Sequence, residues 1–103
     1  MQGCRRLVQE IGNLMLEPVF RKKFKKDLHK MVQRGKSEAK IKVVIRKLLN
    51  QEHLDPEYND HKLSGKLKDF RDCHIEPDWI LMYKISENQL ILARTGTHAD
   101  LFG

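Results

Sequence analysis

The stretch "WILMYKISENQLILAR" (79–94) decides the fold, because it contains two apolar runs joined by a short polar turn. Residues 79–85 are apolar on nearly every position, which is typical of a central strand buried on both faces. "SEN" (86–88) predicts a turn, and "QLILAR" (89–94) predicts the next strand. Because the connection is so short, the two strands are expected to pair antiparallel. The stretch therefore predicts the centre of a small antiparallel sheet.

Two flanking segments extend this sheet. "LKDFRDC" (67–73) alternates polar and apolar residues as a half-buried strand does. "LEPVF" (16–20) is a further candidate strand, and its proline restricts it to an edge or to a strand start. Between the helices and the sheet, residues 54–65 contain Pro, Asp, Asn and Gly and predict a loop.

Two amphipathic helices precede the strands. The segments 19–36 and 37–51 carry apolar residues at helical spacing with charges between them. Gly35 suits the left-handed position after a helix, and Ser37 suits an N-cap. The prediction is a single α+β domain in which a helical hairpin packs on one face of a small antiparallel sheet. The apolar helix positions are Phe20, Phe24, Leu28, Met31, Val32, Ile41, Val44, Ile45, Leu48 and Leu49.

The composition excludes several classes of protein. Hydrophobic residues make up 40% and charged residues 33% of the 103 residues, an ordinary balance for a globular domain. No apolar run approaches the length of a membrane span, and residues 1–16 do not form a convincing secretion signal. Cys4 and Cys73 form no CxxC pair and predict no disulfide framework. A cytoplasmic location without membrane association is therefore expected.

The positive charge is concentrated in the helices. Residues 21–47 contain twelve Lys or Arg and two carboxylates, whereas residues 48–103 contain six Lys or Arg and ten carboxylates. A basic segment of this kind indicates a face that meets a polyanion. A solvated, lysine-rich helical surface explains the same charges equally well.

The expected sheet gathers titratable residues at one edge. In a meander, the end of strand 67–73, the start of strand 79–85 and the end of strand 89–94 lie together. Neighbouring strands are about 4.8 Å apart, so the outer two are separated by roughly 10 Å. His61 lies in the predicted loop and cannot be placed in this way. The residues expected to converge are His74, Asp78, Trp79, Arg94 and His98.

These residue types suit the cleavage of an RNA phosphodiester. The ribose 2′-hydroxyl attacks its own phosphate, so neither a protein nucleophile nor a metal is required. One histidine can remove the 2′ proton while another protonates the departing 5′ oxygen. Arg94 could stabilise charge on the phosphorane, and Trp79 or Phe102 could stack on a base.

Ordinary structural roles explain the same residues. Trp79 begins a buried strand and fits a core position better than a stacking platform. "EPD" (76–78) fits common turn chemistry, Arg94 fits a plain strand-end charge, and Phe102 fits a tail or a core plug. A zinc site is a further alternative, although its spacing matches no standard zinc pattern. Its ligands would be Cys73, His74, Asp78 and His98.

Three motifs resemble a known family. "DHKLSG" (60–65), "RDCHIEPDWILMYKI" (71–85) and "RTGTHADLFG" (94–103) are similar to the YafQ branch of the RelE superfamily, toxins of bacterial type II toxin–antitoxin modules. The resemblance runs from about Met15 to Gly103 and is most specific in the C-terminal part. It implies a RelE-like fold and a ribosome-dependent endoribonuclease that cuts mRNA in the ribosomal A site without a metal or other cofactor. It also implies a cognate antitoxin as partner.

The resemblance also assigns roles to residues. On this basis we hypothesise that His98 and one of His74 or His61 share the acid and base roles, and that Asp78 orients a histidine, balances its charge or transfers a proton itself. Arg94 matches an arginine that faces phosphate in the wider superfamily. The implied catalytic set is His61, His74, Asp78 and His98, and the implied RNA contacts are Trp79, Arg94 and Phe102.

The basic helices acquire a role from the same resemblance, as a surface for ribosomal RNA. Family members tend to begin near residue 15, so residues 1–14 are expected to be an extension outside the core domain, which spans 15–103. The alternative is a toxin of the same fold, or a ribosome-binding module, that acts by binding without RNA cleavage. The expected ribosome-binding residues are Lys22, Lys23, Lys25, Lys26, Lys30 and Arg34.

Overall fold

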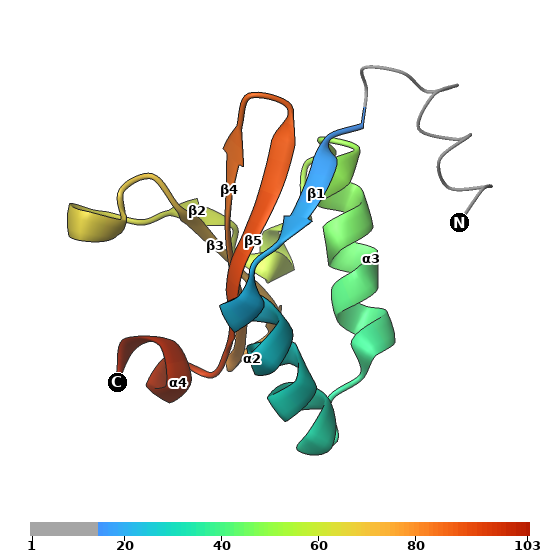
Figure 1. The fold of residues 1–103 in the computed structure, drawn as a ribbon, viewed down its shortest axis with the longest axis vertical. Coiled ribbons are helices and arrows are strands. Elements are labelled where there is room, and N and C mark those ends of the chain that lie inside the picture. The colour runs from blue at the N-terminus through green and yellow to red at the C-terminus, as the bar shows by residue number, and fades with distance from the viewer. Residues whose placement is uncertain (1–14) are drawn as a thin grey trace.

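The computed structural model describes residues 15–103, and the expectation for residues 1–14 lies outside the described part (Figure 1). The predicted helices and strands occur in the predicted order, and a two-residue strand and a short C-terminal helix are present in addition. The elements are β1 (Glu17–Phe20), α2 (Lys22–Gln33), α3 (Glu38–Leu49), the 3₁₀ turn η2 (Pro56–Tyr58), β2 (His61–Lys62), the 3₁₀ turn η3 (Gly65–Leu67), β3 (Arg71–Glu76), β4 (Trp79–Ser86), β5 (Gln89–Gly96) and α4 (His98–Phe102).

The five strands form one sheet in the order β1-β5-β4-β3-β2. The predicted meander is present, because β4 pairs antiparallel with both β3 and β5. β1 pairs parallel with β5, so the sheet is mixed rather than wholly antiparallel. Pro18 lies on this edge strand, where its missing N–H costs no ladder hydrogen bond.

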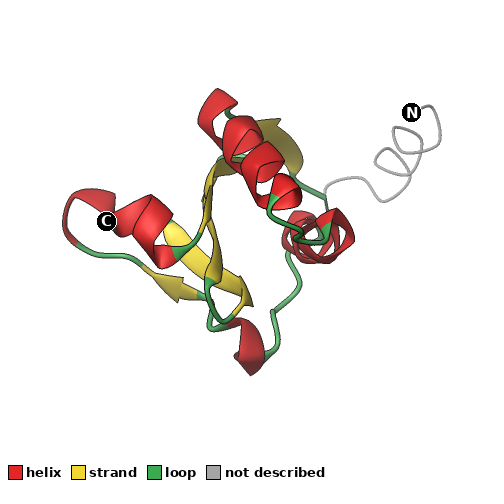
Figure 2. Ribbon diagram, turned by 90° about the horizontal axis from the view of Figure 1, so that it is seen from below, coloured by secondary structure: helices red, strands yellow, loops and turns green. Residues whose placement is uncertain are grey.

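The predicted helical hairpin covers one face of the sheet, while α4 lies on the other side (Figure 2). Both α2 and α3 are twelve residues long, and Gly35 takes a left-handed φ of 96° between them. No helix within residues 15–103 is long and apolar enough to cross a bilayer. The core between the layers includes Phe24, Met31, Ile41, Val44, Leu48, Leu81, Tyr83, Leu90 and Leu92.

Two of the apolar residues that were expected to face the core from the helices are not part of it. Phe20 belongs to β1 rather than to α2, and its side chain is 44% exposed. Val32 lies in α2 as predicted but is 39% exposed. The other predicted apolar positions of α2 and α3 are buried or packed against the core.

The third strand begins later than predicted. Residues 65–67 form η3, and the Phe70 N–H donates to the Leu67 carbonyl, so the ladder starts only at Arg71. The strand therefore contains His74 instead of ending before it. The predicted loop 54–65 also contains two short elements, η2 and β2.

Candidate active site

The strand register places His61 and His74 on the sheet face opposite to α2 and α3, which we call the open face. Directly paired residues share a face, and Cys73, Leu81 and Thr95 form a row on the helix-covered face. The neighbouring rows therefore point to the open face. These rows are His61–Asp72–Met82–Arg94 and His74–Ile80–Gly96.

Three histidines lie side by side at one end of the open face. The ring centroids of His61 and His74 are 6.2 Å apart, and those of His74 and His98 are 5.5 Å apart. The three rings come from β2, β3 and α4, so residues distant in the chain are brought to one place. His61, which the sequence could not place, is positioned by the two-residue pairing of β2 with β3.

Asp78 holds His98 through two hydrogen bonds. Its Oδ1 accepts from the backbone N–H of His98 at 2.9 Å and from the ring Nδ1 at 2.6 Å. These bonds, the backbone one first, lower the pKa of the Asp78 carboxyl below its usual range. With Nδ1–H committed to the carboxylate, Nε2 is the ring atom of His98 that can exchange a proton with a substrate.

His61 is oriented in the same manner. Its Nδ1 lies 2.7 Å from the carbonyl oxygen of Asn59, to which Nδ1–H donates. Asn59 takes a left-handed φ of 47° at the end of η2, and this turn directs its carbonyl toward the imidazole. The outer two histidines therefore both keep Nε2 available, with His74 between them.

Asp72 is a site residue that the sequence analysis missed. It pairs directly with His61 across the strands and precedes His74 by two residues on the same face. Its side chain is buried, and within the described chain Oδ1 has no hydrogen-bond partner. Burial raises the pKa of the Asp72 carboxyl, while the neighbouring histidines oppose this shift. The available signal was its alternation with His74 along β3.

Two ion pairs connect the end of β3 to the helical hairpin. Glu76 accepts from Lys36 at 2.6 Å and from Lys40 at 2.9 Å, which lowers the pKa of the Glu76 carboxyl. Asp78 follows in the turn between Glu76 and the start of β4. The turn chemistry expected of "EPD" and the contact with His98 therefore coexist.

Helix α4 is seated against the end of β5 by its own sequence. A Cβ at Gly96 would lie 2.9 Å from the Asp100 Cβ, so only glycine allows this approach. Thr97 and Asp100 form a capping box that starts the helix. Within α4, the Phe102 ring lies 6.5 Å from the His98 ring and is 45% exposed, so it is available to a ligand.

Arg34 anchors α4 to α2 and is not a free cation. Its guanidinium contacts both carboxylate oxygens of Asp100, at 2.7 and 3.3 Å. This pairing is the main reason that the pKa of Asp100 lies well below its usual range. Of the residues expected to bind the ribosome, Arg34 is thus paired within the fold, whereas the five lysines of α2 are exposed and make no ion pair within residues 15–103.

The expected stacking role of Trp79 is contradicted by its burial. Its side chain is 0% exposed on the helix-covered face. The indole N–H donates to the Thr95 hydroxyl at 2.8 Å, and that hydroxyl donates to the Ile80 carbonyl at 2.7 Å. The tryptophan of "EPDW" and the threonine of "RTGTH" therefore lock two strands together inside the core.

Arg94 is already neutralised. Its guanidinium contacts both carboxylate oxygens of Asp27, at 2.6 and 3.2 Å, and Asp27 also accepts from the Thr95 backbone N–H. β1 ends opposite Leu92, so β5 extends beyond it. Asp27 accepts a hydrogen bond from the backbone of this extended part, at Thr95. A phosphate would have to compete with this carboxylate for Arg94.

The four residues of the alternative zinc site do not come together in the structure. Cys73 and His74 are adjacent on β3 and therefore point to opposite faces, with Cys73 fully buried in the core. Burial also raises the pKa of the Cys73 thiol, which disfavours the thiolate that zinc requires. Within residues 15–103 no three His, Cys, Asp or Glu side chains are arranged to hold a metal ion.

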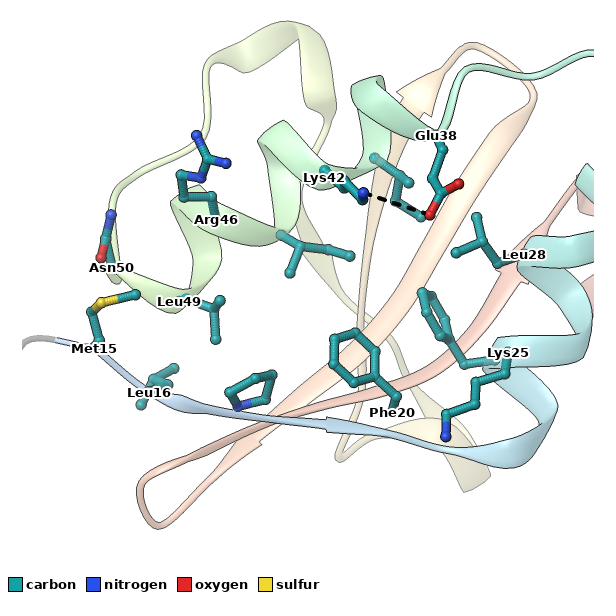
Figure 3. Close-up of a pocket in the computed structure, with 14 residues that line it drawn as sticks. Met15, Leu16, Phe20, Lys25, Leu28, Glu38, Lys42, Arg46, Leu49 and Asn50 are labelled. Atoms are coloured by element: carbon teal, nitrogen blue, oxygen red, sulfur yellow. Dashed lines mark ion pairs between the residues drawn. The ribbon is translucent and has the colours of Figure 1, made fainter. Parts of the chain in front are cut away.

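A second surface lies on the helical side. A groove of about 910 Å³ runs between β1, α2 and α3 (Figure 3). Its floor is apolar and includes Phe20, Leu28 and Leu49, while Lys25, Lys42 and Arg46 lie along its sides. Its one carboxylate, Glu38, lies 3.8 Å from Lys42. The groove is therefore apolar with a positive rim.

The fold and its C-terminal histidine site define a small bacterial toxin, and comparison with known proteins identifies the family. Residues 16–103 match the family described as the bacterial toxin of type II toxin–antitoxin systems, YafQ. The chain belongs to this family. It is 44% identical over 81 residues to the mRNA interferase toxin YafQ of Escherichia coli K12, covering 78% of this chain and 88% of that protein.

Solved structures agree with this assignment. The toxin in the E. coli DinJ–YafQ toxin–antitoxin complex superposes with a TM-score of 0.80 at 40% identity, over 86% of this chain and 99% of that one. A metal-bound toxin from Helicobacter pylori superposes with a TM-score of 0.81 at 44% identity, over 85% and 100%. These likenesses confirm the predicted α+β, RelE-like architecture.

Proposed function

We propose that this toxin is a ribosome-dependent endoribonuclease that cuts mRNA in the ribosomal A site by metal-independent acid–base catalysis and so inhibits translation. The observation that carries the proposal is the row of three histidines, in which His61 and His98 each have Nδ1 bound to an oxygen and Nε2 available. The mRNA interferase name of its E. coli relative supports the same activity. An enzyme acting on ribosomes would work in the cytoplasm.

The reaction needs one base and one acid on opposite sides of a phosphate. The base takes the proton of the 2′-hydroxyl, and the 2′ oxygen bonds to the phosphorus of its own nucleotide. The bond to the 5′ oxygen then breaks, and the acid gives that oxygen a proton. The products are a 2′,3′-cyclic phosphate and a 5′-hydroxyl, so no metal-bound water is required.

The geometry supports a division of labour among the histidines. His98 and His61 flank His74, which supports the outer two as the base and the acid across a phosphate. His74 would then face the phosphate and stabilise its developing negative charge. Asp78 orients His98, and the buried Asp72 beside His61 would offset the positive charge that a ring gains when it takes up a proton.

Phe102 and the basic helix complete the proposal. The exposed Phe102 ring beside His98 would stack on a base of the strand being cut. The free lysines of α2, Lys22, Lys23, Lys25, Lys26 and Lys30, would contact ribosomal RNA, so ribosome affinity should fall steeply with salt. An affinity that is flat between low and physiological salt would contradict this part.

The proposal is tested by mapping mRNA 3′ ends after incubation with purified toxin. One arm uses free mRNA with EDTA, and the other uses mRNA on programmed ribosomes, which keep the magnesium that they need. New ends at the A site on ribosomes alone support the proposal, while cuts on free RNA would remove the ribosome dependence. If folded toxin arrested translation without new ends in either arm, the binding-only alternative would hold instead.

The apolar groove is the surface we assign to the antitoxin. E. coli YafQ is solved in complex with DinJ, and a partner of the same kind is proposed for this chain. The positive rim of the groove complements an amphipathic antitoxin segment with acidic flanks. The groove lies on the helix-covered side of the sheet, away from the three histidines, so this contact would leave them uncovered.

Two exposed apolar strand residues provide a matched test of the groove. Phe20 lines it and is 44% exposed, whereas Ile85 lies outside it and is 47% exposed. Phe20→Asp should abolish co-purification with the antitoxin encoded beside this toxin, and Ile85→Asp should not. Equal binding by both variants would remove the groove from the interface.

A further inference from the structure

The open face extends beyond the histidines to a second group of side chains, Arg21, Phe70 and Lys84. The Lys84 ammonium lies 5.2 Å from the centroid of the Phe70 ring, and the Arg21 guanidinium lies 6.0 Å from it. Both distances fall within the range of a cation–π attraction. One ring therefore holds two cations, and we call these three residues the Phe70 clamp.

The clamp belongs to the same face as the catalytic candidates. Lys84 follows Met82 by two residues on β4, and Phe70 precedes Asp72 by two residues, directly before the first residue of β3. Arg21 follows β1 and bonds through its N–H to Leu92 on β5, so its side chain spans the sheet to reach the ring beside β3. The three side chains thus meet over the open face from three separate segments of the chain.

The two cations of the clamp have no counter-charge among residues 15–103. Neither Arg21 nor Lys84 makes an ion pair with any carboxylate of residues 15–103. The other described arginines of this region differ, since Arg71 and Arg94 each contact an aspartate. Two like charges held over one ring repel each other, and an anion between them relieves that repulsion. The clamp is therefore suited to a negatively charged ligand.

The distance to the histidines fits a neighbouring part of the same strand of RNA. Phe70 and His74 are four residues apart along β3, which corresponds to about 13 Å of strand. A single-stranded RNA lying along the open face, with its scissile phosphate at the histidines, would carry a flanking phosphate toward the clamp. The intervening residue on this face is the carboxylate Asp72, which is buried and does not contact either cation.

We propose that the Phe70 clamp binds a backbone phosphate of the mRNA beside the bond that is cut. Arg21 and Lys84 contact the phosphate, and Phe70 is a positioning residue that holds both cations. The identity of the ligand as RNA rests on the proposed function, whereas its anionic character rests on the clamp itself.

The test measures RNA binding without cleavage. The probe is a short, fluorescently labelled single-stranded RNA with 2′-O-methyl groups throughout, which lacks the attacking hydroxyl. Its dissociation constant is measured by anisotropy over a range of salt concentrations for wild type, Arg21→Gln, Lys84→Gln and the double variant. Each lost phosphate contact should reduce the slope of log affinity against log salt by about 0.7, and the double variant by about 1.4.

Lys47→Gln is the matched control. Lys47 is half-buried like Lys84, makes no ion pair within residues 15–103, and lies on α3 in the layer across the sheet. Its removal changes the net charge equally and should leave the slope unchanged. Equal slopes for Lys47→Gln and Lys84→Gln would overturn the clamp, because net charge alone would then explain binding. Absence of any binding to the probe at low salt would overturn it as well.

Substitutions of Phe70 test whether its ring positions the two cations, because they leave the net charge unchanged. Phe70→Tyr keeps the aromatic face and should retain wild-type affinity, while Phe70→Leu keeps an apolar side chain but releases the cations. For Phe70→Leu we expect several-fold weaker binding at low salt, with the folded state verified by circular dichroism. Identical affinities for the two variants would contradict the positioning role.

Ribosomal cleavage measured in parallel distinguishes the two proposals. If wild type cuts mRNA but the clamp variants keep the wild-type salt slope, the clamp fails and the proposed function stands. If wild type cuts nothing while the clamp variants still lose slope, the clamp stands and the proposed function fails.

Discussion

The two faces of the same three strands have opposite properties. On the helix-covered face, Leu81 and Trp79 are completely buried, and the indole N–H has a hydrogen-bond acceptor in Thr95. On the open face, His74 and His98 stay accessible, and Asp72 keeps a buried oxygen without a partner in the described chain. Strand alternation thus assigns stability to one face and chemistry to the other, so neighbouring residues can be changed with separate consequences.

The largest stability effect is expected on the covered face. Leu81→Ala should lower the free energy of unfolding by about 2–5 kcal/mol, because it leaves a cavity beneath α2 and α3. Urea denaturation measures this change, and Ile85→Ala, exposed on the same strand, should stay within about 0.5 kcal/mol of wild type. Below its unfolding transition, Leu81→Ala should keep wild-type cleavage. A tenfold loss of cleavage in the folded variant would contradict the claim that the covered face contributes to stability and not to the chemistry.

Asp72→Asn should raise the stability of the fold and lower the rate of RNA cleavage. It removes a buried carboxylate with an unpaired oxygen and should stabilise the fold at pH 7 by about 1 kcal/mol. It should also weaken cleavage, because the histidines lose the nearby negative charge.

The pH dependence of this stabilisation is a further check. The pKa of Asp72 is raised in the folded protein, so wild type loses stability as the pH rises and this group ionises. The gain of Asp72→Asn over wild type should therefore be small near pH 4 and larger at pH 7. A gain that shrinks as the pH rises would contradict the assignment.

The smallest effect is expected at α4. The pKa of Asp100 is lowered in the folded protein, so its stabilising contribution is full above the ordinary carboxyl range and is lost as acid protonates it. Asp100→Asn should therefore speed hydrogen exchange of the Leu101 and Gly103 amides several-fold at neutral pH, where these amides bond to Thr97 and Ala99. Asp69→Asn, on an exposed carboxylate without an ion pair, should leave these rates unchanged.

Much of the fold could be predicted from local patterns. The two helices, the central hairpin and the edge position of "LEPVF" all follow from periodicity, glycine and proline. The meander geometry also predicts that His74, Asp78 and His98 lie together, and they do. These predictions succeeded because they depend on short stretches of chain and on the fixed spacing of strands.

The rest depends on long-range pairing that no local pattern contains. β2 is two residues long, and its position is set by Asp60, which accepts from Tyr83 at 2.7 Å and Arg71 at 3.3 Å. His61 is brought beside His74 only by that arrangement. Arg94 looked free because its partner Asp27 lies on α2, far away in the sequence.

Asp72 and Trp79 are two further residues whose positions could not be predicted from the local sequence. A carboxylate in a strand resembles a solvent-facing residue, and only the register reveals that Asp72 is buried beside the histidines. Trp79 lies next to the catalytic candidate Asp78 in sequence, yet the pleat turns it to the opposite face. Adjacency in the chain was therefore a poor guide to membership of the site.

The most direct test of the central claim measures cleavage and stability together for His98→Gln. Its side chain is more than half exposed, so its replacement should leave the free energy of unfolding unchanged. Mapping of mRNA 3′ ends on programmed ribosomes should show cleavage reduced by about 10²–10⁴-fold, the usual contribution of an acid–base group. Cleavage within about threefold of wild type, from a variant of unaltered stability, would show that the open-face histidines do not perform the chemistry.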